Sequence, residues 1–255
     1  MQHLKIETAE KQKLNTYIYG TENAQTAIIF CHGFSGNSSG LFKPQLAEEL
    51  SHKYLVCRFD FRGQGNSDGK FHDTSITHEL EDLDCVVAYV RRQYSPEKIV
   101  LLGHSFGAAV ALLYASQNKI DGLVSLSGEG DLEKAVIYEF TEKQLEDLRT
   151  RGETLVENWS EDGDENLLGK QFLDDMLRYS TTDAAKKLQC PILFIHGKND
   201  DVIPYDATEK MYKLVRSPKE IKLMENTDHT YNFFTNKPKT KEVFSNIKDW
   251  LDKYF

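Results

Sequence analysis

The stretch Gly103-His104-Ser105-Phe106-Gly107 decides the fold, because it joins two segments of different character. Residues 98–102 before it form a short apolar run rich in branched side chains, which predicts a buried strand. Residues 108–115 after it are rich in alanine and leucine and predict a helix. A Gly-x-Ser-x-Gly pattern between a strand and a helix predicts a sharp turn that exposes the serine at the top of a sheet. Ser105 is therefore the candidate nucleophile.

A serine hydroxyl at its ordinary pKa is a weak nucleophile, so it needs a base and an acid that orients the base. In a strand–turn–helix arrangement of this kind, the acid and then the histidine follow the serine in the chain. Only His196 and His229 follow Ser105, and His196 ends an apolar strand before any loop acid. We therefore expect the general base to be His229, in a polar loop after the strand-like residues 220–224.

The loop after His196 offers two adjacent candidates for the acid, Asp200 and Asp201. Successive residues of an extended loop point in different directions, so only one of them can reach the histidine. We expect Asp200, because the Val-Ile-Pro that follows then packs down and aims the loop, whereas Asp201 caps the next helix or stays solvated. The alternative is an acid from the loop one strand earlier, which contains Glu129 and Asp131.

Two backbone N–H groups are expected to bind the substrate oxygen as it gains negative charge. Residues 26–31 predict a strand that runs into His32-Gly33-Phe34, where the glycine allows a close approach of the backbone. The N–H of Phe34 can then face that of Phe106, at the positive end of the helix dipole. Each donor of this kind contributes about 3 kcal/mol of transition-state stabilisation.

The rest of the chain alternates strand-like and helical segments, and 255 residues suffice for one large α/β domain. This alternation predicts a mostly parallel sheet with helices on both faces. Residues 4–6 and 14–19 predict an antiparallel hairpin at its start. The other strand-like runs are 54–59, 120–126 and 191–195, and the helical ones are 75–94, 206–216 and about 239–255.

Residues 129–187 interrupt the alternation and are too long for a simple connection, with helical patches at 141–148 and 171–177. We interpret them as a cap, inserted after the sixth strand and lying over Ser105, so that the core comprises residues 1–128 and 188–255. The cap has 16 acidic and 8 basic residues, which indicates a solvated acidic face and an entrance that repels anionic substrates. The candidate substrate-binding residues on its apolar underside are Tyr138, Trp159, Phe172, Met176 and Tyr179.

The chain contains, in this order, the motifs His32-Gly33-Phe34, residues 59–68, the Ser105 turn, His196-Gly197-x-x-Asp200 and Asp228-His229. Together they resemble the α/β-hydrolase superfamily, in particular feruloyl (cinnamoyl) esterases and, more loosely, monoacylglycerol lipases and serine-aminopeptidase-like hydrolases. The resemblance covers almost the whole chain apart from the cap, and it implies the α/β-hydrolase fold with an eight-stranded sheet. The chain departs from the pattern at Gln64, where relatives more often have histidine, and at Ala108, where a third glycine often follows the serine turn.

Composition argues against several other classes of protein. The net charge is −9 and no basic cluster occurs, so nucleic-acid binding is not expected. No apolar run approaches the ~20 residues that span a bilayer, and the polar start lacks a signal-peptide core, so we expect a cytoplasmic protein without a membrane span. The four cysteines show no Cys-x-x-Cys spacing and are expected to be reduced and buried. We expect no metal and no cofactor, and His32, His104 and His196 are expected to be packed and hydrogen-bonded.

These observations predict a serine hydrolase that cleaves carboxylic esters with small or medium acyl or hydroxycinnamoyl groups, through an acyl-enzyme on Ser105. A serine at this position argues against dehalogenases and epoxide hydrolases, which use aspartate there. The expected partner is a small-molecule ester, and the expected oligomeric state is a monomer or a homodimer. Alternative activities are those of a thioesterase, a monoacylglycerol lipase or an aminopeptidase-like amidase. A non-catalytic binding protein on a hydrolase scaffold is an alternative from a different class.

Overall fold

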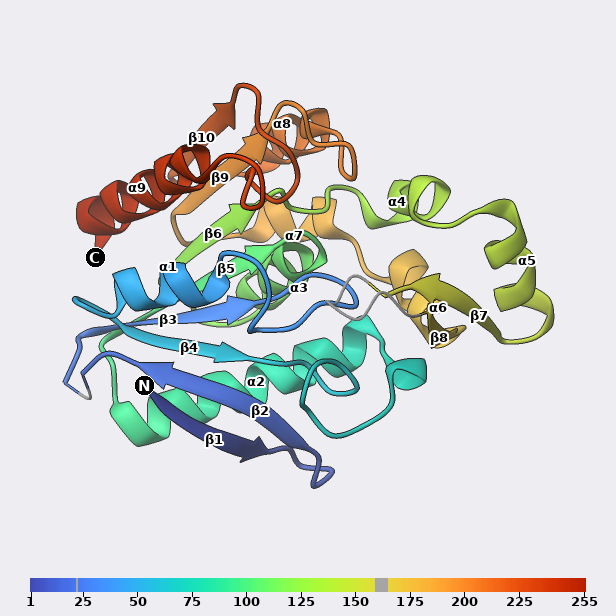
Figure 1. Ribbon diagram of the computed structural model, residues 1–255, viewed down its shortest axis with the longest axis horizontal. Helices are drawn as coiled ribbons and strands as arrows, with labels where there is room; N and C mark the ends of the chain where they lie inside the picture. Colours follow the sequence, from blue (N-terminus) through green and yellow to red (C-terminus); the bar gives the residue numbers. More distant parts are fainter. Residues whose placement is uncertain (22, 159–164) are drawn as a thin grey trace.

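An eight-stranded sheet runs through the protein in the order β1-β2-β4-β3-β5-β6-β9-β10 (Figure 1). The computed structural model describes residues 1–21, 23–158 and 165–255. Strands β1 (Gln2–Glu7) and β2 (Lys13–Tyr19) pair antiparallel, as β2 does with β4 (Leu55–Phe59), and the remaining neighbours pair parallel. The predicted mostly parallel sheet and its opening hairpin are therefore confirmed. The parallel strands that follow β4 in this order are β3 (Thr26–Cys31), β5 (Lys98–His104), β6 (Gly122–Leu126), β9 (Ile192–Gly197) and β10 (Lys219–Met224).

Helices cover both faces of the sheet, because side chains alternate along each buried strand. In β3, Ile28 and Phe30 join a core with α1 (Lys43–Leu50) and α9 (Lys237–Tyr254). Ile29 faces the other core, with the helices α2 (Ile76–Tyr94), α3 (Phe106–Ala115), α7 (Thr181–Lys187) and α8 (Tyr205–Leu214). The sheet is thus the middle of three layers, as the α/β class requires.

Local signals in the sequence account for the start, the buried face and the end of α2, a long helix that packs on the same face of the sheet as α3. Ser75 caps its start by accepting a hydrogen bond from the His78 N–H at 3.1 Å. Its apolar residues recur three and four positions apart, and Leu83, Val86 and Val90 are fully buried. The helix ends at Tyr94, before Ser95 in the left-handed conformation. The expected boundaries, residues 75–94, differ from the observed ones by one residue.

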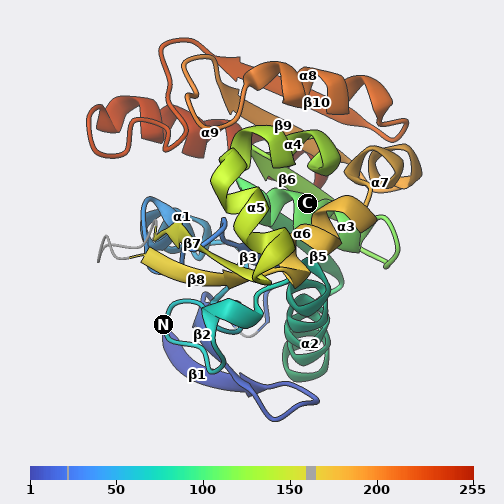
Figure 2. The same cartoon turned by 90° about the vertical axis from the view of Figure 1, so that its right-hand side faces the viewer.

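The cap residues form α4 (Leu132–Glu139), α5 (Glu142–Thr150), the antiparallel pair β7 (Glu153–Glu157) and β8 (Glu165–Gly169), and α6 (Gln171–Arg178). They lie together on the side toward which the parallel strands run (Figures 1 and 2). The two predicted helical patches correspond to α5 and α6. The β7–β8 pair was not expected from the sequence; it packs against a short 3-10 turn, η1 (Phe71–Asp73), of the core.

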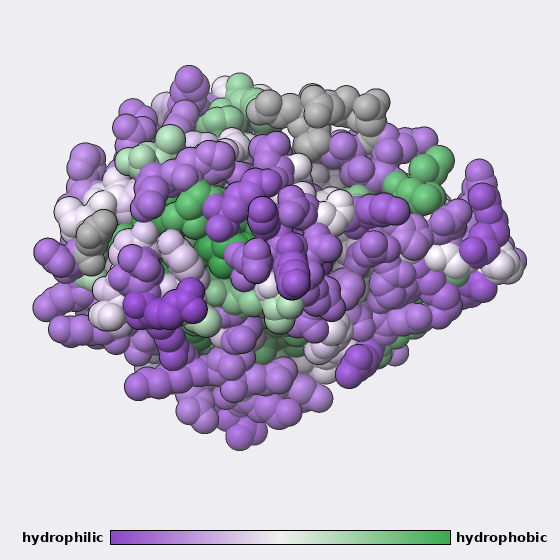
Figure 3. Space-filling model, turned by 90° about the horizontal axis from the view of Figure 1, so that it is seen from below, coloured by the Kyte–Doolittle hydropathy of each residue, from purple (hydrophilic) through white to green (hydrophobic). Residues whose placement is uncertain are grey.

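Most of the surface seen in Figure 3 is hydrophilic, with apolar residues gathered in smaller patches. This distribution agrees with the 28% of charged residues in the chain. Within the described parts of the chain, no helix combines the length and apolar character needed to cross a membrane.

Candidate active site

Ser105 lies at the sharp turn between β5 and α3, where the sequence places it. Its backbone has φ 56° and ψ −129°, a conformation that is uncommon and strained for a residue with a side chain. The Ser105 N–H donates to the Leu126 carbonyl at 2.9 Å, and the Ser105 carbonyl accepts from the Ala108 N–H at 2.9 Å. The neighbouring strand and the first turn of the helix therefore hold the serine in its strained conformation.

Two glycines allow the backbone to pack closely around this turn. A Cβ at Gly107 would lie 2.3 Å from the His32 carbonyl oxygen, so α3 rests directly on the end of β3. A Cβ at Gly33 would lie 3.0 Å from the Ser105 Cβ and 3.4 Å from its Oγ. The loop after β3 consequently lies against the serine, where the sequence predicts a backbone donor.

The structure brings His229 and Asp200 together from two different loops. Nδ1 of His229 lies 2.8 Å from Oδ2 of Asp200, which is the geometry of an N–H donating to a carboxylate. Asp200 follows β9 and is fully buried, whereas His229 follows β10 and keeps 11% of its side chain exposed. A bond of this kind fixes the tautomer and orientation of the imidazole.

The Asp200 carboxylate has partners besides His229, and the sequence does not indicate them. Its Oδ1 accepts from the N–H groups of Val202 and Ile203 at 3.0 and 2.9 Å. Its Oδ2 also lies 3.0 Å from Nε2 of the buried His196, whose Nδ1 is 2.7 Å from the Thr208 hydroxyl. Burial alone would raise the pKa of the Asp200 carboxyl, but the hydrogen bonds from the two histidines and the backbone outweigh it and hold this pKa well below its ordinary value. The carboxylate is thus charged and fixed in place.

His196 is the residue whose contribution sequence reasoning missed. The sequence indicates only a packed histidine at a strand end, and the structure confirms that it is buried and hydrogen-bonded. In the sequence, the only sign of a link between His196 and Asp200 is that they lie four positions apart. Nε2 of His196 lies 2.9 Å from the Ile203 carbonyl oxygen as well as 3.0 Å from Oδ2 of Asp200, so the ring packs against the loop that carries the acid.

The alternative acids lie in other environments. Asp201 is exposed to solvent. Asp131 pairs with Lys134 in α4 at 3.0 Å. Glu129 is buried, and its carboxyl hydrogen-bonds to that of Glu139 in the cap. Asp200 is the one of these four carboxylates for which the structure gives a hydrogen bond to His229.

His104 connects the serine turn to the histidine loop. Its Nε2 lies 3.0 Å from the His229 carbonyl oxygen, and the two rings are 4.9 Å apart between centroids. Burial, reinforced by the neighbouring His229, lowers the pKa of His104 well below its ordinary value, so the ring is neutral at pH 7. Because His104 directly precedes Ser105, this contact places the loop of His229 beside the serine.

The expected oxyanion donors lie on either side of the serine turn. Phe106 is the first residue of α3, and Phe34 lies in the loop that follows β3. Among the described residues, neither of these N–H groups donates to a backbone or side-chain acceptor. Both donors are therefore available to an oxygen of a bound substrate.

Phenylalanine rings gather around these donors. Phe34 lies 5.4 Å from Phe71 of η1 and 4.8 Å from Phe172 of the cap, and Phe172 also lies 5.0 Å from Phe106 and 6.3 Å from Phe140. This ring cluster includes Phe106, the residue directly after Ser105, and of its members Phe172 was among the cap residues named from the sequence. Phe71 was not, because nothing in its local sequence marks it.

The other cap candidates differ in position. Met176 lies one turn after Phe172 on α6 and is buried in the same core. The Tyr179 hydroxyl instead lies 3.0 Å from the Thr77 hydroxyl of α2. Trp159 lies outside the described residues, and so does the side chain of Tyr138.

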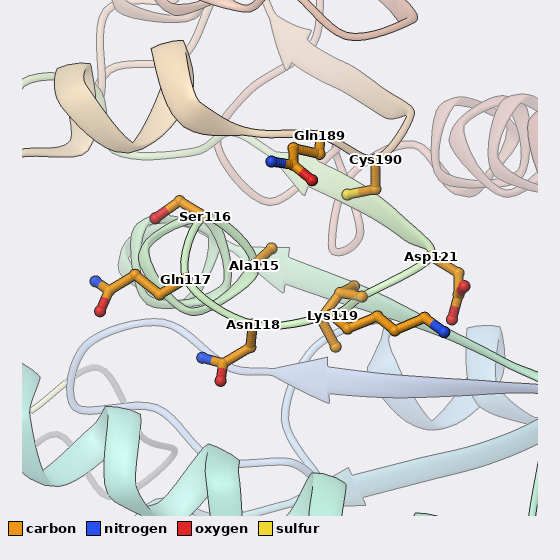
Figure 4. Close-up of a pocket in the computed structure, with 9 residues that line it drawn as sticks. Ala115, Ser116, Gln117, Asn118, Lys119, Asp121, Gln189 and Cys190 are labelled. Carbon is orange, nitrogen blue, oxygen red and sulfur yellow. The ribbon is translucent and has the colours of Figure 1, made fainter.

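Two cavities lie away from this constellation. One, of about 460 Å³, is lined by the end of α3 and the residues before β6 and β9, including Asn118, Lys119 and Cys190 (Figure 4). A second, of about 580 Å³, lies between α2, α3 and the β1–β2 turn. Ser105, Asp200 and His229 line neither of them. Within the described ranges, no group of three or more His, Cys, Asp or Glu residues is arranged to hold a metal ion.

Comparison with known proteins identifies relatives over most of the chain. Residues 26–172 match the family described as alpha/beta hydrolase fold, and residues 165–233 match the family described as serine aminopeptidase, S33. The uncharacterized protein YqkD of Bacillus subtilis is 28% identical over 97% of this chain and 78% of its own. The lysophosphatidylserine lipase ABHD12 of Danio rerio is 24% identical over 84% of this chain, which spans only 53% of that protein.

A solved structure shares the whole architecture. Est1E from Butyrivibrio proteoclasticus, with bound ferulic acid, superposes with a TM-score of 0.82 at 24% identity. The superposition covers 98% of each chain. At this identity the likeness shows a common fold.

Proposed function

The chain belongs to the alpha/beta hydrolase fold family, and from that premise we propose that it is a serine hydrolase that cleaves carboxylic esters. The observation that carries the proposal is the combination of a strained Ser105 at the strand–helix turn with His229 bound to a buried, charged Asp200. The phenylalanine cluster beside the serine supports an apolar acyl group of small or medium size, or a hydroxycinnamoyl group. The ferulic acid bound to the structurally similar Est1E agrees with the second of these.

The proposed reaction begins when Oγ of Ser105 attacks the ester carbonyl carbon and passes its proton to Nε2 of His229. Asp200 holds the Nδ1 proton and stabilises the imidazolium that forms. The carbonyl oxygen, now negatively charged, accepts from the N–H groups of Phe34 and Phe106. The carbon–oxygen bond to the alcohol then breaks, and His229 gives its proton to the leaving oxygen. A water molecule, deprotonated by His229, hydrolyses the acyl-enzyme and releases the acid.

The first test is hydrolysis of p-nitrophenyl esters of increasing acyl length, together with methyl ferulate. Replacing the nucleophile in Ser105→Ala should lower kcat/KM by about 10⁴-fold or more. Ser116→Ala, at the other end of α3, is the matched control and should retain activity. Full turnover by Ser105→Ala would refute the proposal. The absence of both ester turnover and fluorophosphonate labelling of Ser105 in the wild type would favour a binding protein on this scaffold.

An aminopeptidase-like amidase is a second candidate, favoured by one observation. Glu129, whose N–H lies 3.4 Å from the Ser105 carbonyl, hydrogen-bonds to Glu139 of α4. Burial, together with the charge of Glu129, raises the pKa of Glu139 to about 8. A carboxyl pair in this position supports recognition of a substrate ammonium group. Alanine p-nitroanilide and alanine p-nitrophenyl ester separate the two candidates: turnover of both supports the amidase, and turnover of the ester alone supports the esterase.

A further inference from the structure

Phe172 of the cap contacts both residues that carry the proposed oxyanion donors. It is the second residue of α6, and only 3% of its surface is exposed. Its ring centroid lies 4.8 Å from that of Phe34 and 5.0 Å from that of Phe106, which are themselves 6.2 Å apart. A single aromatic ring from the cap is therefore packed against both sides of the oxyanion site.

The two donors are held in different ways. Phe106 is part of a regular helix, and its side chain is buried. Phe34 belongs to the loop between β3 and α1, is only partly buried, and precedes Ser35, which has a positive φ of 48°. The Ser35 hydroxyl donates to the Glu157 carbonyl at the end of β7 at 3.3 Å, so the cap also holds this loop by a second contact. The position of the Phe34 N–H thus depends on packing from outside its own segment.

The helix that carries Phe172 is itself anchored to the core. The Asp175 carboxylate, on the same helix, accepts from the Thr77 N–H of α2 at 2.8 Å. The hydroxyl of Tyr179, just after the helix, lies 3.0 Å from the Thr77 hydroxyl. Gln171 hydrogen-bonds to the His72 carbonyl of η1. These contacts fix α6 at both ends, so it can present the Phe172 ring at a defined place.

We propose that Phe172 is a positioning residue that fixes the spacing of the Phe34 and Phe106 N–H groups, so that the cap takes part in transition-state stabilisation. This inference rests on the proposed ester hydrolysis. An oxyanion donor acts only when it lies 2.7–3.1 Å from the developing charge. A loosened Phe34 therefore weakens binding of the transition state while leaving binding of a small substrate almost unchanged, and it lowers kcat rather than raising KM.

The test uses p-nitrophenyl acetate, whose two-carbon acyl group is too short to depend on a deep pocket. Phe172→Ala should lower kcat about tenfold, with KM within about twofold of the wild type. The loss of kcat is smaller than the loss on complete removal of an oxyanion donor, because both N–H groups are still present. Phe172→Leu, which keeps most of the volume, should recover most of kcat and also serves if the alanine variant does not fold. Leu148→Ala in α5 is the matched control, because it removes a fully buried cap side chain that is not part of the phenylalanine cluster, and it should keep kcat.

The possible outcomes separate the inference from the function on which it rests. A rise in KM with unchanged kcat would overturn the inference and make Phe172 a pocket wall. Equal losses of kcat in Phe172→Ala and Leu148→Ala would overturn it in favour of a general weakening of the cap. A wild type that neither turns over esters nor reacts with a fluorophosphonate would overturn the proposed function and the inference together.

Discussion

Asp200 and Asp201 are adjacent in the chain and lie in opposite environments. Asp200 is buried and binds His196, His229 and two backbone N–H groups, whereas Asp201 is exposed. We expect Asp200→Asn to lower kcat/KM on p-nitrophenyl acetate by about 10⁴-fold, because an amide cannot keep the imidazole in the working tautomer. Asp201→Asn should stay within about twofold of the wild type. Similar losses in the two variants would contradict the assignment.

Glu79 of α2 is a buried carboxyl that the reaction does not use. It accepts from the Gln64 amide at 2.8 Å, and burial raises its pKa from 4.5 to about 8. The folded protein therefore binds a proton that the unfolded chain releases between these values, so stability falls as the pH rises from 4.5 to 8. We expect Glu79→Gln to be more stable than the wild type at about pH 9 and to lose this advantage at about pH 5. Urea unfolding of both proteins at the two pH values measures the difference in their free energies of unfolding. An identical difference at both pH values would refute the prediction.

At the level of elements, the contact between β3 and α3 depends on a missing side chain. A methyl group at Gly107 would collide with the carbonyl oxygens of His32 and Cys31, at 2.3 and 2.4 Å. These are backbone atoms, so the helix has to move away from the strand. We expect Gly107→Ala to lower the free energy of unfolding by about 1–3 kcal/mol and to displace Ser105, with a large loss of kcat. Thermal unfolding and ester turnover measure the two effects.

Ala108→Gly is the matched control for the same helix. It introduces a third glycine after the serine turn and costs about 1 kcal/mol through helix propensity alone. Its kcat should stay close to that of the wild type. A Gly107→Ala variant with wild-type turnover would show that the helix adjusts without moving the serine.

The β7–β8 pair shows where prediction from the sequence fails for an element. The side chains of β7 alternate between buried and exposed positions, but both strands are five residues long and contain glutamates. Such a short pair is stable only when it packs on other elements. Here those elements are α5 and η1, and η1 lies about 80 residues earlier in the chain.

For the whole molecule, the main feature is the concentration of negative charge in the cap, which has 16 acidic and 8 basic residues. A field of this sign repels anionic substrates and attracts cationic ones, and salt screens it. We expect kcat/KM for an anionic ester, mono-p-nitrophenyl succinate, to rise severalfold between about 10 mM and about 500 mM NaCl. A p-nitrophenyl ester with a trimethylammonium group should respond in the opposite direction, and p-nitrophenyl acetate should not respond. An equal response of all three esters to salt would mean that the negative charge of the cap does not affect how substrates enter the site.

The sequence by itself determined the fold class, the serine turn and the order of most strands and helices of the core, because these depend on local periodicity and on glycines at a tight turn. It also narrowed the histidine to His229 and the acid to a few carboxylates. Only the tertiary structure decided that Asp200 meets His229, that His196 supports Asp200, and that Phe172 packs on Phe34 and Phe106. These contacts join residues that lie far apart in the chain or point in directions set by packing. Local sequence carries no information on such distances, since they arise only when the whole sheet and cap assemble.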